Sequence, residues 1–213
     1  MNKKYILFDL DGTILDSLPL IRQSFEQVFK QMDIPWGQGE VMQTVGLPLA
    51  EICRLFGKDR QQEMFERYLT FQDTVHDRII RVFPGAIDCL AVLKEQNLPL
   101  GVVTSKRRRM TLRGLQITGL EKFFDVTVTM EDTSRHKPAA DPVLKAMEQI
   151  RALPAATVYV GDSHFDIQAG KNAGVRTVGV TWGMAGPEHL KAHSPDHLVE
   201  NWEELTRLLT TKI

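Results

Sequence analysis

Short apolar runs alternate with stretches of helical periodicity along most of the chain. The first run, Tyr5 to Phe8, is apolar at every position and ends in Asp9, a pattern typical of a strand that is buried on both faces. Similar runs follow at Leu98 to Thr104, Val126 to Val128, Thr157 to Val160 and Thr177 to Val180. Buried strands separated by helices predict an α/β fold, in which a Rossmann-like parallel sheet is sandwiched by helices.

The strand pattern is absent between Asp16 and Val82, where apolar residues recur at helical spacing. The two apolar stripes are Ile21, Phe25, Val28, Phe29 and Met32, and then Met64, Phe65, Tyr68 and Leu69. Asp16 or Ser17 would cap the first of these helices, with Pro19 in its first turn. We therefore expect a core of residues 1–15 and 83–213 and a small inserted all-helical cap domain of residues 16–82. Helices that merely complete one compact fold are the alternative.

Composition and charge narrow the classes of partner. The chain has 213 residues, with 26 basic against 27 acidic side chains and a formal net charge of -1, so the whole molecule has no field that would collect nucleic acid or an anionic membrane. Its basic start is followed by an apolar run that Asp9 cuts short, so we expect no export signal, and no apolar run is long enough for a membrane span. Two isolated cysteines, Cys53 and Cys89, fit a reducing compartment, and we expect a cytoplasmic protein.

The strongest chemical signal is the run Asp9-Leu10-Asp11-Gly12-Thr13 at the carboxyl end of the first predicted strand. Open α/β sheets bind their ligands at this edge. Strand alternation places Asp9 and Asp11 on one side, and Gly12 allows the sharp turn that lets both carboxylates converge. Two carboxylates about 4 Å apart repel each other by about 4 kcal/mol at an effective dielectric near 20, so a shared proton or a cation must offset the repulsion.

A hard dication with oxygen ligands suits these carboxylates, and Mg²⁺ commonly uses one or two carboxylates together with substrate phosphate. Zinc is a poor candidate. The six histidines, which show no spacing of the HExxH kind, are expected to be ordinary surface residues: His76, His136, His164, His189, His193 and His197.

A second acidic pair follows the predicted strand that ends at Val160. In the run Gly161-Asp162-Ser163-His164-Phe165-Asp166, Asp162 would face the first pair across neighbouring strands. Asp166 lies four residues further on, one helical turn away. Alone, this pattern also describes a helix amino terminus with favourable acids.

Three cationic or hydroxyl-bearing segments are candidates for binding phosphate. Thr104-Ser105-Lys106 follows a predicted strand and offers hydroxyls, main-chain N–H groups and a nearby cation. Lys137 lies in a proline-bounded turn, from which its ammonium would neutralise a phosphoryl group and a nucleophile. The basic run from Lys106 to Arg109, with Arg113 beyond, is interpreted mainly as a solvated helix face.

In order and type, these motifs resemble those of the haloacid dehalogenase superfamily of phosphohydrolases over essentially the whole chain. The motifs are Asp9-x-Asp11-Gly12-Thr13, Thr104-Ser105, Lys137-Pro138 and Gly161-Asp162-Ser163-x-x-Asp166. The subgroup looks like the phosphoglycolate phosphatases and related enzymes, including a bacterial inorganic pyrophosphatase, as does the stretch Ala173 to Gly183. One departure is Ala140, where relatives commonly have proline.

The resemblance implies a Mg²⁺-dependent phosphatase that forms an aspartyl-phosphate. It implies Asp9 as the nucleophile and Asp11 as the general acid and base. It implies that Asp9, Asp162 and the main-chain carbonyl of Asp11 hold the metal, and that Asp166 orients the lysine or a metal-bound water. Thr104 and Lys137 would bind phosphate, and Gly12, Thr13, Ser105 and Lys106 are further candidates for binding phosphate or substrate.

Several alternatives are weighed against this assignment. A dehalogenase lacks an acid at the position of Asp11, and a phosphonate-cleaving relative has a small residue there together with a Schiff-base lysine in the cap. A phosphomutase has a histidine early in the cap, where residues 16–32 contain none. A signalling receiver domain has a different residue order and lacks the helical insertion. A catalytically silent relative stays open, as does the substrate: phosphoglycolate, pyrophosphate or another small phosphorylated metabolite. We expect a monomer or homodimer.

Overall fold

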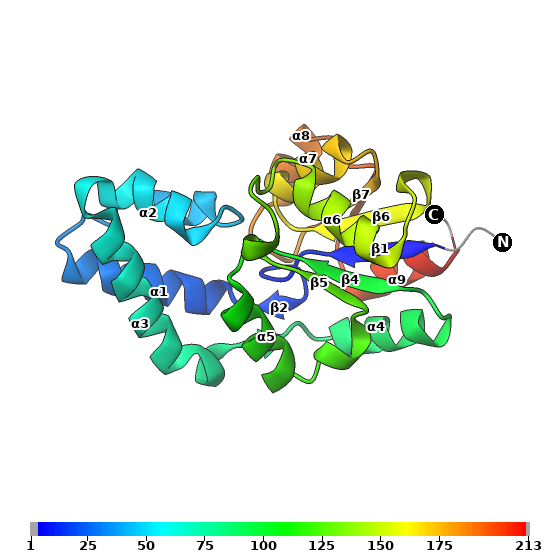
Figure 1. Cartoon of the computed structure of the whole chain (residues 1–213), viewed down its shortest axis with the longest axis horizontal. Coiled ribbons are helices and arrows are strands. Elements are labelled where there is room, and N and C mark those ends of the chain that lie inside the picture. Colours follow the sequence, from blue (N-terminus) through cyan, green and yellow to red (C-terminus); the bar gives the residue numbers. More distant parts are fainter. Residues whose placement is uncertain (1–3, 212–213) are drawn as a thin grey trace.

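The computed structural model describes residues 4–211; residues 1–3, which belong to the basic start of the chain, and residues 212–213 lie outside the description. A parallel sheet of six strands has the order β5-β4-β1-β6-β7-β8 (Figure 1). The strands are β1 Tyr5–Phe8, β4 Leu100–Val103, β5 Val126–Val128, β6 Thr157–Gly161, β7 Arg176–Val180 and β8 His197–Val199. The expected α/β fold with a parallel sheet is confirmed.

Helices cover both faces of this sheet. The helices are α4 Ala86–Glu95, α5 Arg108–Ile117, α6 Asp141–Ile150, α7 His164–Asn172, α8 Pro187–Ala192 and α9 Trp202–Thr211. Side chains alternate along β1, so that Ile6 and Phe8 join the apolar cluster under α4, α5 and α9, whereas Leu7 joins the cluster under α6 and α7. Because both faces are covered, β1 and β4 contain no polar side chain and the other strands are mostly apolar, which is why their runs are visible in the sequence.

Residues 16–82 form a group of helices at one end of the molecule, beside the sheet rather than over it (Figure 1). This helical segment contains α1 Leu18–Gln31, α2 Leu49–Gly57 and α3 Gln61–Ile79, with short 3-10 turns between them. Their apolar stripes meet in a cluster that is separate from the core of the sheet, and Phe25, Val28, Met64 and Tyr68 belong to it. The segment therefore has a small hydrophobic core of its own.

Two short strands mark where the chain leaves the core and returns. β2, Leu15–Asp16, pairs antiparallel with β3, Arg81–Val82. Strands this short give almost no periodicity signal, and the sequence did not predict them. β8 at the edge of the sheet was also missed. Ser17 stands at the N-cap of α1, but its side chain makes no cap hydrogen bond.

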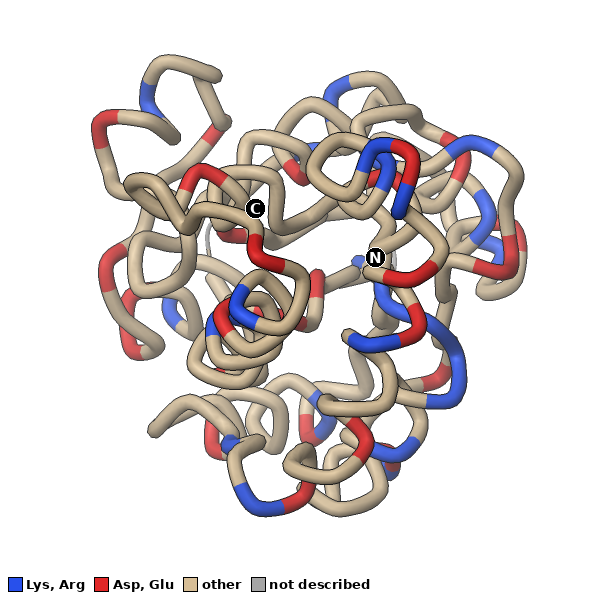
Figure 2. The backbone as a smooth tube through the Cα atoms, turned by 90° about the vertical axis from the view of Figure 1, so that its left-hand side faces the viewer, with Lys and Arg blue, Asp and Glu red and all other residues tan. Residues whose placement is uncertain are grey.

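Charge is mixed over the end of the molecule that carries the helical segment. Figure 2 shows acidic and basic positions interleaved on the face it presents, in keeping with the net charge of -1. Within residues 4–211, none of the helices is both long and apolar enough to cross a membrane. Because the charge is mixed and nearly balanced, any recognition of an anion must depend on a few local cations.

Candidate active site

Three neighbouring strands direct the predicted site residues to one edge of the sheet. Asp9 follows β1, Thr104 follows β4 and Asp162 follows β6, and β1 lies between the other two. The backbone N–H of Asp9 donates to the carbonyl of Val160 at 2.8 Å, and that of Thr104 donates to Val128 at 2.9 Å. The sheet ladder thus continues into both residues and fixes where their side chains begin.

Lys137 reaches this edge from the loop before α6. Its buried Nζ donates to Oδ1 of Asp9 at 2.7 Å and to Oδ1 of Asp166 at 2.6 Å. The hydroxyl of Tyr159 lies 3.0 Å from the same Asp166 oxygen. Ala140, the departure from the family pattern, stands at the N-cap of α6, and the lysine nevertheless contacts both carboxylates.

Asp162 is held by a hydroxyl and by the backbone of a later loop. Thr13 Oγ1 donates to its Oδ1 at 3.0 Å, and the N–H of Met184 donates to its Oδ2 at 2.6 Å. Gly12 and Gly183 approach so closely that a Cβ on either would collide with the Asp162 carboxylate. Gly12 also has a φ of +83°, which disfavours any side chain there.

Asp166 and Ser163 close the start of α7. Ser163 is the N-cap, and its N–H and hydroxyl donate to Asp166 Oδ2 at 3.0 and 2.6 Å. This is a capping box, and the second acidic pair thus does lie at a helix amino terminus, as the alternative interpretation of the sequence held. The other oxygen of Asp166 still contacts Lys137, so one carboxylate both caps the helix and positions the lysine. A Cβ on Gly161 would strike Asp166, so this glycine permits the close approach.

The buried cluster carries an excess of negative charge. Asp9, Asp162 and Asp166 offer carboxylate oxygens within 4.8 Å of one another, and the ammonium of Lys137 contacts Asp9 and Asp166. Burial and the neighbouring Asp166 raise the pKa of Asp162 to about 7. Burial raises the pKa of Asp9 well above its usual value, against the effect of Lys137. Burial lowers the pKa of Lys137, but contact with Asp166 and Asp9 outweighs this effect and keeps that pKa well above its usual value.

These residues fit a hard dication. When all three carboxylates are ionised, the one ammonium leaves two negative charges uncompensated, and the raised pKa values of Asp9 and Asp162 reflect how costly unpaired charge is in a buried site. Oxygen donors are the ligands that Mg²⁺ accepts. The carboxylate of Asp11 is not a member of this cluster, and the resemblance implies only the main-chain carbonyl of Asp11 as a metal ligand.

Asp11 instead pairs with Lys106 from the loop after β4. Lys106 Nζ lies 2.8 Å from Asp11 Oδ1, and the two side chains are 9% and 16% exposed. Lys106 is therefore part of the site and is not on a solvated face. Beyond it, Arg109 and Arg113 form ion pairs with Asp73 of α3. The basic run is thus divided between the site and a contact with the helical segment.

The loop after β4 also supplies hydroxyls. Thr104 Oγ1 accepts a hydrogen bond from the N–H of Lys106 at 3.2 Å. Ser105 Oγ is buried and has no hydrogen-bond partner among the described residues. Burying a hydroxyl without a partner costs free energy, so Ser105 is suited to bind an oxygen-rich ligand.

A cavity connects this edge with the helical segment. Its polar wall includes Asp9, Asp11, Thr104, Ser105, Lys106, Lys137 and Asp162. Its apolar wall comes from the helical segment and includes Ile21, Phe25, Leu47, Ile52, Tyr68 and Leu69. The segment also touches the core, since a Cβ on Gly46 would lie only 2.7 Å from the ring of Phe165 in α7. A ligand in the cavity would thus contact both parts of the chain.

Sequence reasoning missed some residues of the site. The N–H of Met184 has no sequence signature, although the neighbouring Gly183 lies in a stretch that resembled the family. Tyr159 was counted as an apolar strand residue, and its hydroxyl reaches Asp166. Arg107 lines the cavity and lies over the ring of Phe65 at 5.4 Å.

Comparison with known proteins gives concordant matches. The family model described as "Haloacid dehalogenase-like hydrolase" matches residues 6–180. The pyrophosphatase PpaX of Anoxybacillus flavithermus is 36% identical over 210 residues, 98% of this chain and 98% of that protein. The pyrophosphatase PpaX of Oceanobacillus iheyensis is 34% identical, again with 98% of each covered. A haloacid dehalogenase-like family hydrolase from Streptococcus pneumoniae has a similar structure, with a TM-score of 0.85, 25% identity and coverage of 95% of this chain and 96% of that chain.

Proposed function

Because the chain belongs to the haloacid dehalogenase-like hydrolase family, we propose that it is a Mg²⁺-dependent phosphatase that forms an aspartyl-phosphate on Asp9. The observation that carries the proposal is the meeting of four distant segments at one edge of the sheet. Lys137 contacts Asp9, and Asp162 lies within the same carboxylate cluster. Thr104 and Ser105 line the cavity beside them.

The proposed metal ligands are the carboxylates of Asp9 and Asp162 and the main-chain carbonyl of Asp11. When bound, Mg²⁺ would supply charge neutralisation, so that an anionic nucleophile and an anionic phosphate tolerate each other. Lys137 contributes a fixed positive charge next to the nucleophile, and Asp166 holds the lysine in place. The hydroxyls of Thr104 and Ser105 and the cation of Lys106 bind phosphate oxygens.

In the first step, a carboxylate oxygen of Asp9 attacks phosphorus, and the bond from phosphorus to the leaving oxygen breaks. Asp11 donates its proton to that oxygen as it departs. In the second step, water attacks the phosphorus of the aspartyl-phosphate, and Asp11 accepts a proton from the water. The bond to Asp9 breaks, phosphate leaves, and both aspartates return to their starting states.

The helical segment of residues 16–82 is proposed as a cap that selects the leaving group. Its support is the cavity, which has the catalytic carboxylates on one wall and Phe25, Leu47 and Tyr68 on the other. Bulk water would be excluded from such a cavity when a substrate fills it, which strengthens the electrostatic interactions inside.

Two substrate classes are each favoured by specific observations. Inorganic pyrophosphate is favoured because the relatives of 34% and 36% identity are named pyrophosphatases, and because Lys106 and Arg107 line the cavity where a second phosphate would be held. A small phosphate monoester, of the phosphoglycolate type or with a less polar organic part, is favoured by the apolar wall. The site is proposed to act on the first class, with the second as the alternative.

A substrate screen with and without Mg²⁺ tests the function. We expect phosphate release from pyrophosphate or from small monoesters in Mg²⁺, and loss of release when a chelator removes the ion. Mg²⁺ should also raise the melting temperature, because an ion that binds only the folded state stabilises it. Failure to hydrolyse pyrophosphate, every monoester and a generic aryl phosphate would instead favour a catalytically silent phosphate-binding protein.

A second prediction concerns Asp11. Asp11→Asn removes the proposed proton donor and should lower kcat for a poor leaving group by about 10²- to 10⁴-fold. For an aryl phosphate with an acidic phenol the first step needs little protonation, so the aspartyl-phosphate should still form and then persist. Rapid-quench detection of phosphorylated protein would show this accumulation. Equal losses for all leaving groups would contradict the proton-transfer role.

A cytoplasmic location is also proposed, supported by the two buried cysteines, Cys53 and Cys89, which are both free thiols.

A further inference from the structure

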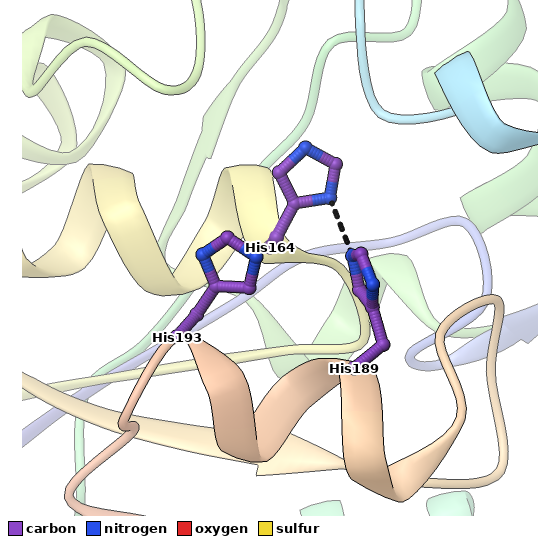
Figure 3. A group of neighbouring side chains, drawn as sticks. All are labelled: His164, His189 and His193. Atoms are coloured by element: carbon purple, nitrogen blue, oxygen red, sulfur yellow. Dashed lines mark hydrogen bonds between the residues drawn. The ribbon is translucent and has the colours of Figure 1, made fainter.

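Three histidines that are far apart in the sequence lie together on the surface of the core. His164 is the first residue of α7, His189 lies in α8, and His193 follows the last turn of α8 (Figure 3). The ring centroids of His164 and His189 are 5.2 Å apart, those of His164 and His193 are 5.1 Å apart, and those of His189 and His193 are 5.2 Å apart. The three rings therefore form a nearly equilateral triangle.

The ring nitrogens have a spacing that suits a metal ion. His189 Nε2 lies 3.3 Å from His164 Nδ1, and each of the three residues offers a nitrogen within 4.8 Å of the others. Tetrahedral coordination with Zn–N bonds of about 2.0–2.1 Å places two ligand nitrogens about 3.3 Å apart. A hydrogen bond between two neutral imidazoles would explain one close pair, but it gives no reason for the third ring to join them.

We propose that His164, His189 and His193 form a transition-metal site for which Zn²⁺ is the ligand. All three donors are imidazole nitrogens, which suit zinc better than a hard ion such as Mg²⁺. His189 is exposed and the other two are half-buried, so solvent can fill the remaining coordination position. The site is separate from the carboxylate cluster in both its residues and its chemistry.

The bound ion would brace two segments that flank the active site. α7 begins one residue after Ser163, and α8 follows the loop in which Met184 donates to Asp162. α7 and α8 also contact each other through a small apolar cluster that includes Ile167 and Leu190. A metal ion bound by His164, His189 and His193 would join α7 to α8 independently of this apolar cluster. The expected consequence is a higher melting temperature with zinc.

The test measures zinc binding by isothermal titration of the full chain in excess Mg²⁺, which occupies the carboxylate cluster. The wild type should bind one equivalent. His189→Ala and His193→Ala should each weaken zinc binding by at least about 10- to 100-fold. That is the loss caused by removing a residue that only orients a metal ligand, and these substitutions remove a ligand itself. His197→Ala is the matched control, because this histidine is half-buried in β8 and is outside the triangle. It should bind zinc like the wild type.

Two further readouts distinguish the site from a general loss of structure. Co²⁺ in place of zinc should give the intense visible absorption of a tetrahedral ion in the wild type and in His197→Ala, but not in His189→Ala. Mg²⁺-dependent phosphate release should be unchanged in His189→Ala, which shows that the variant is folded. Zinc affinity and a Co²⁺ spectrum that are the same in His189→Ala as in the wild type would overturn the proposal, as would the absence of saturable binding in the wild type.

Discussion

Replacing Asp9 with asparagine is expected to lower kcat by on the order of 10⁴- to 10⁶-fold, the size of loss seen when a covalent nucleophile is removed. Asparagine has nearly the same shape but no anionic oxygen with which to attack phosphorus. Phosphate release is the first measurement, and the absence of a phosphorylated protein after rapid quenching is the second. Lys137 would keep Asp166 as a partner at 2.6 Å, so the variant should still fold.

The control for this substitution is Asp88→Asn, since Asp88 is exposed in α4, on an element that does not line the cavity. It removes the same charge from the molecule and should leave kcat unchanged. Turnover in Asp9→Asn at more than a small fraction of the wild-type rate would refute the assignment of the nucleophile. Loss of turnover in both variants would point to net charge instead of chemistry.

Lys137→Met should affect both activity and stability. The Lys137 side chain is 1% exposed, and its removal leaves Asp9 and Asp166 buried without their shared cation. Breaking a buried ion pair in this way typically costs about 3–5 kcal/mol of unfolding free energy. The lost charge next to the nucleophile should also lower kcat by about 10²- to 10³-fold. Urea unfolding and steady-state kinetics measure the two effects.

A second substitution separates the two roles of Lys137. Adding Asp166→Asn to Lys137→Met removes one of the uncompensated charges, so part of the lost stability should return while kcat stays low. Lys145→Met is the surface control, because Lys145 pairs with Glu148 in solvent and such pairs contribute about 0–1 kcal/mol. A loss in Lys137→Met no larger than that in Lys145→Met would contradict the proposed burial of charge.

The parts of the fold that could be predicted are the strands whose apolar sequence directly reflects their burial between helices. The strand before Asp9 is apolar at each position because helices cover both of its faces. The strand before Asp162 likewise packs Val158 and Val160 against one face and Tyr159 against the other. The carboxyl ends of parallel strands lie on one edge, so the sequence alone could predict that these aspartates approach each other.

The remaining features depend on contacts that no local pattern encodes. β8 is an edge strand of three residues, His197–Val199, with little room for periodicity. Lys106 was assigned to phosphate binding, but its pairing with Asp11 depends on how two loops converge. His189 and His193 have the i, i+4 spacing of one helix face. Their third neighbour, His164, belongs to a different helix, so the sequence could not predict that the three histidines lie together.

The pairing of Leu15–Asp16 with Arg81–Val82 has a consequence for how such enzymes diversify. Paired strands lie about 5 Å apart, so everything between them leaves and re-enters the core through adjacent positions. A module attached in this way can be lengthened, shortened or exchanged during evolution without displacing the strand that ends in Asp9. If the proposed function holds, selection for a new leaving group can act on the apolar wall while Asp9 and Asp162 keep their places.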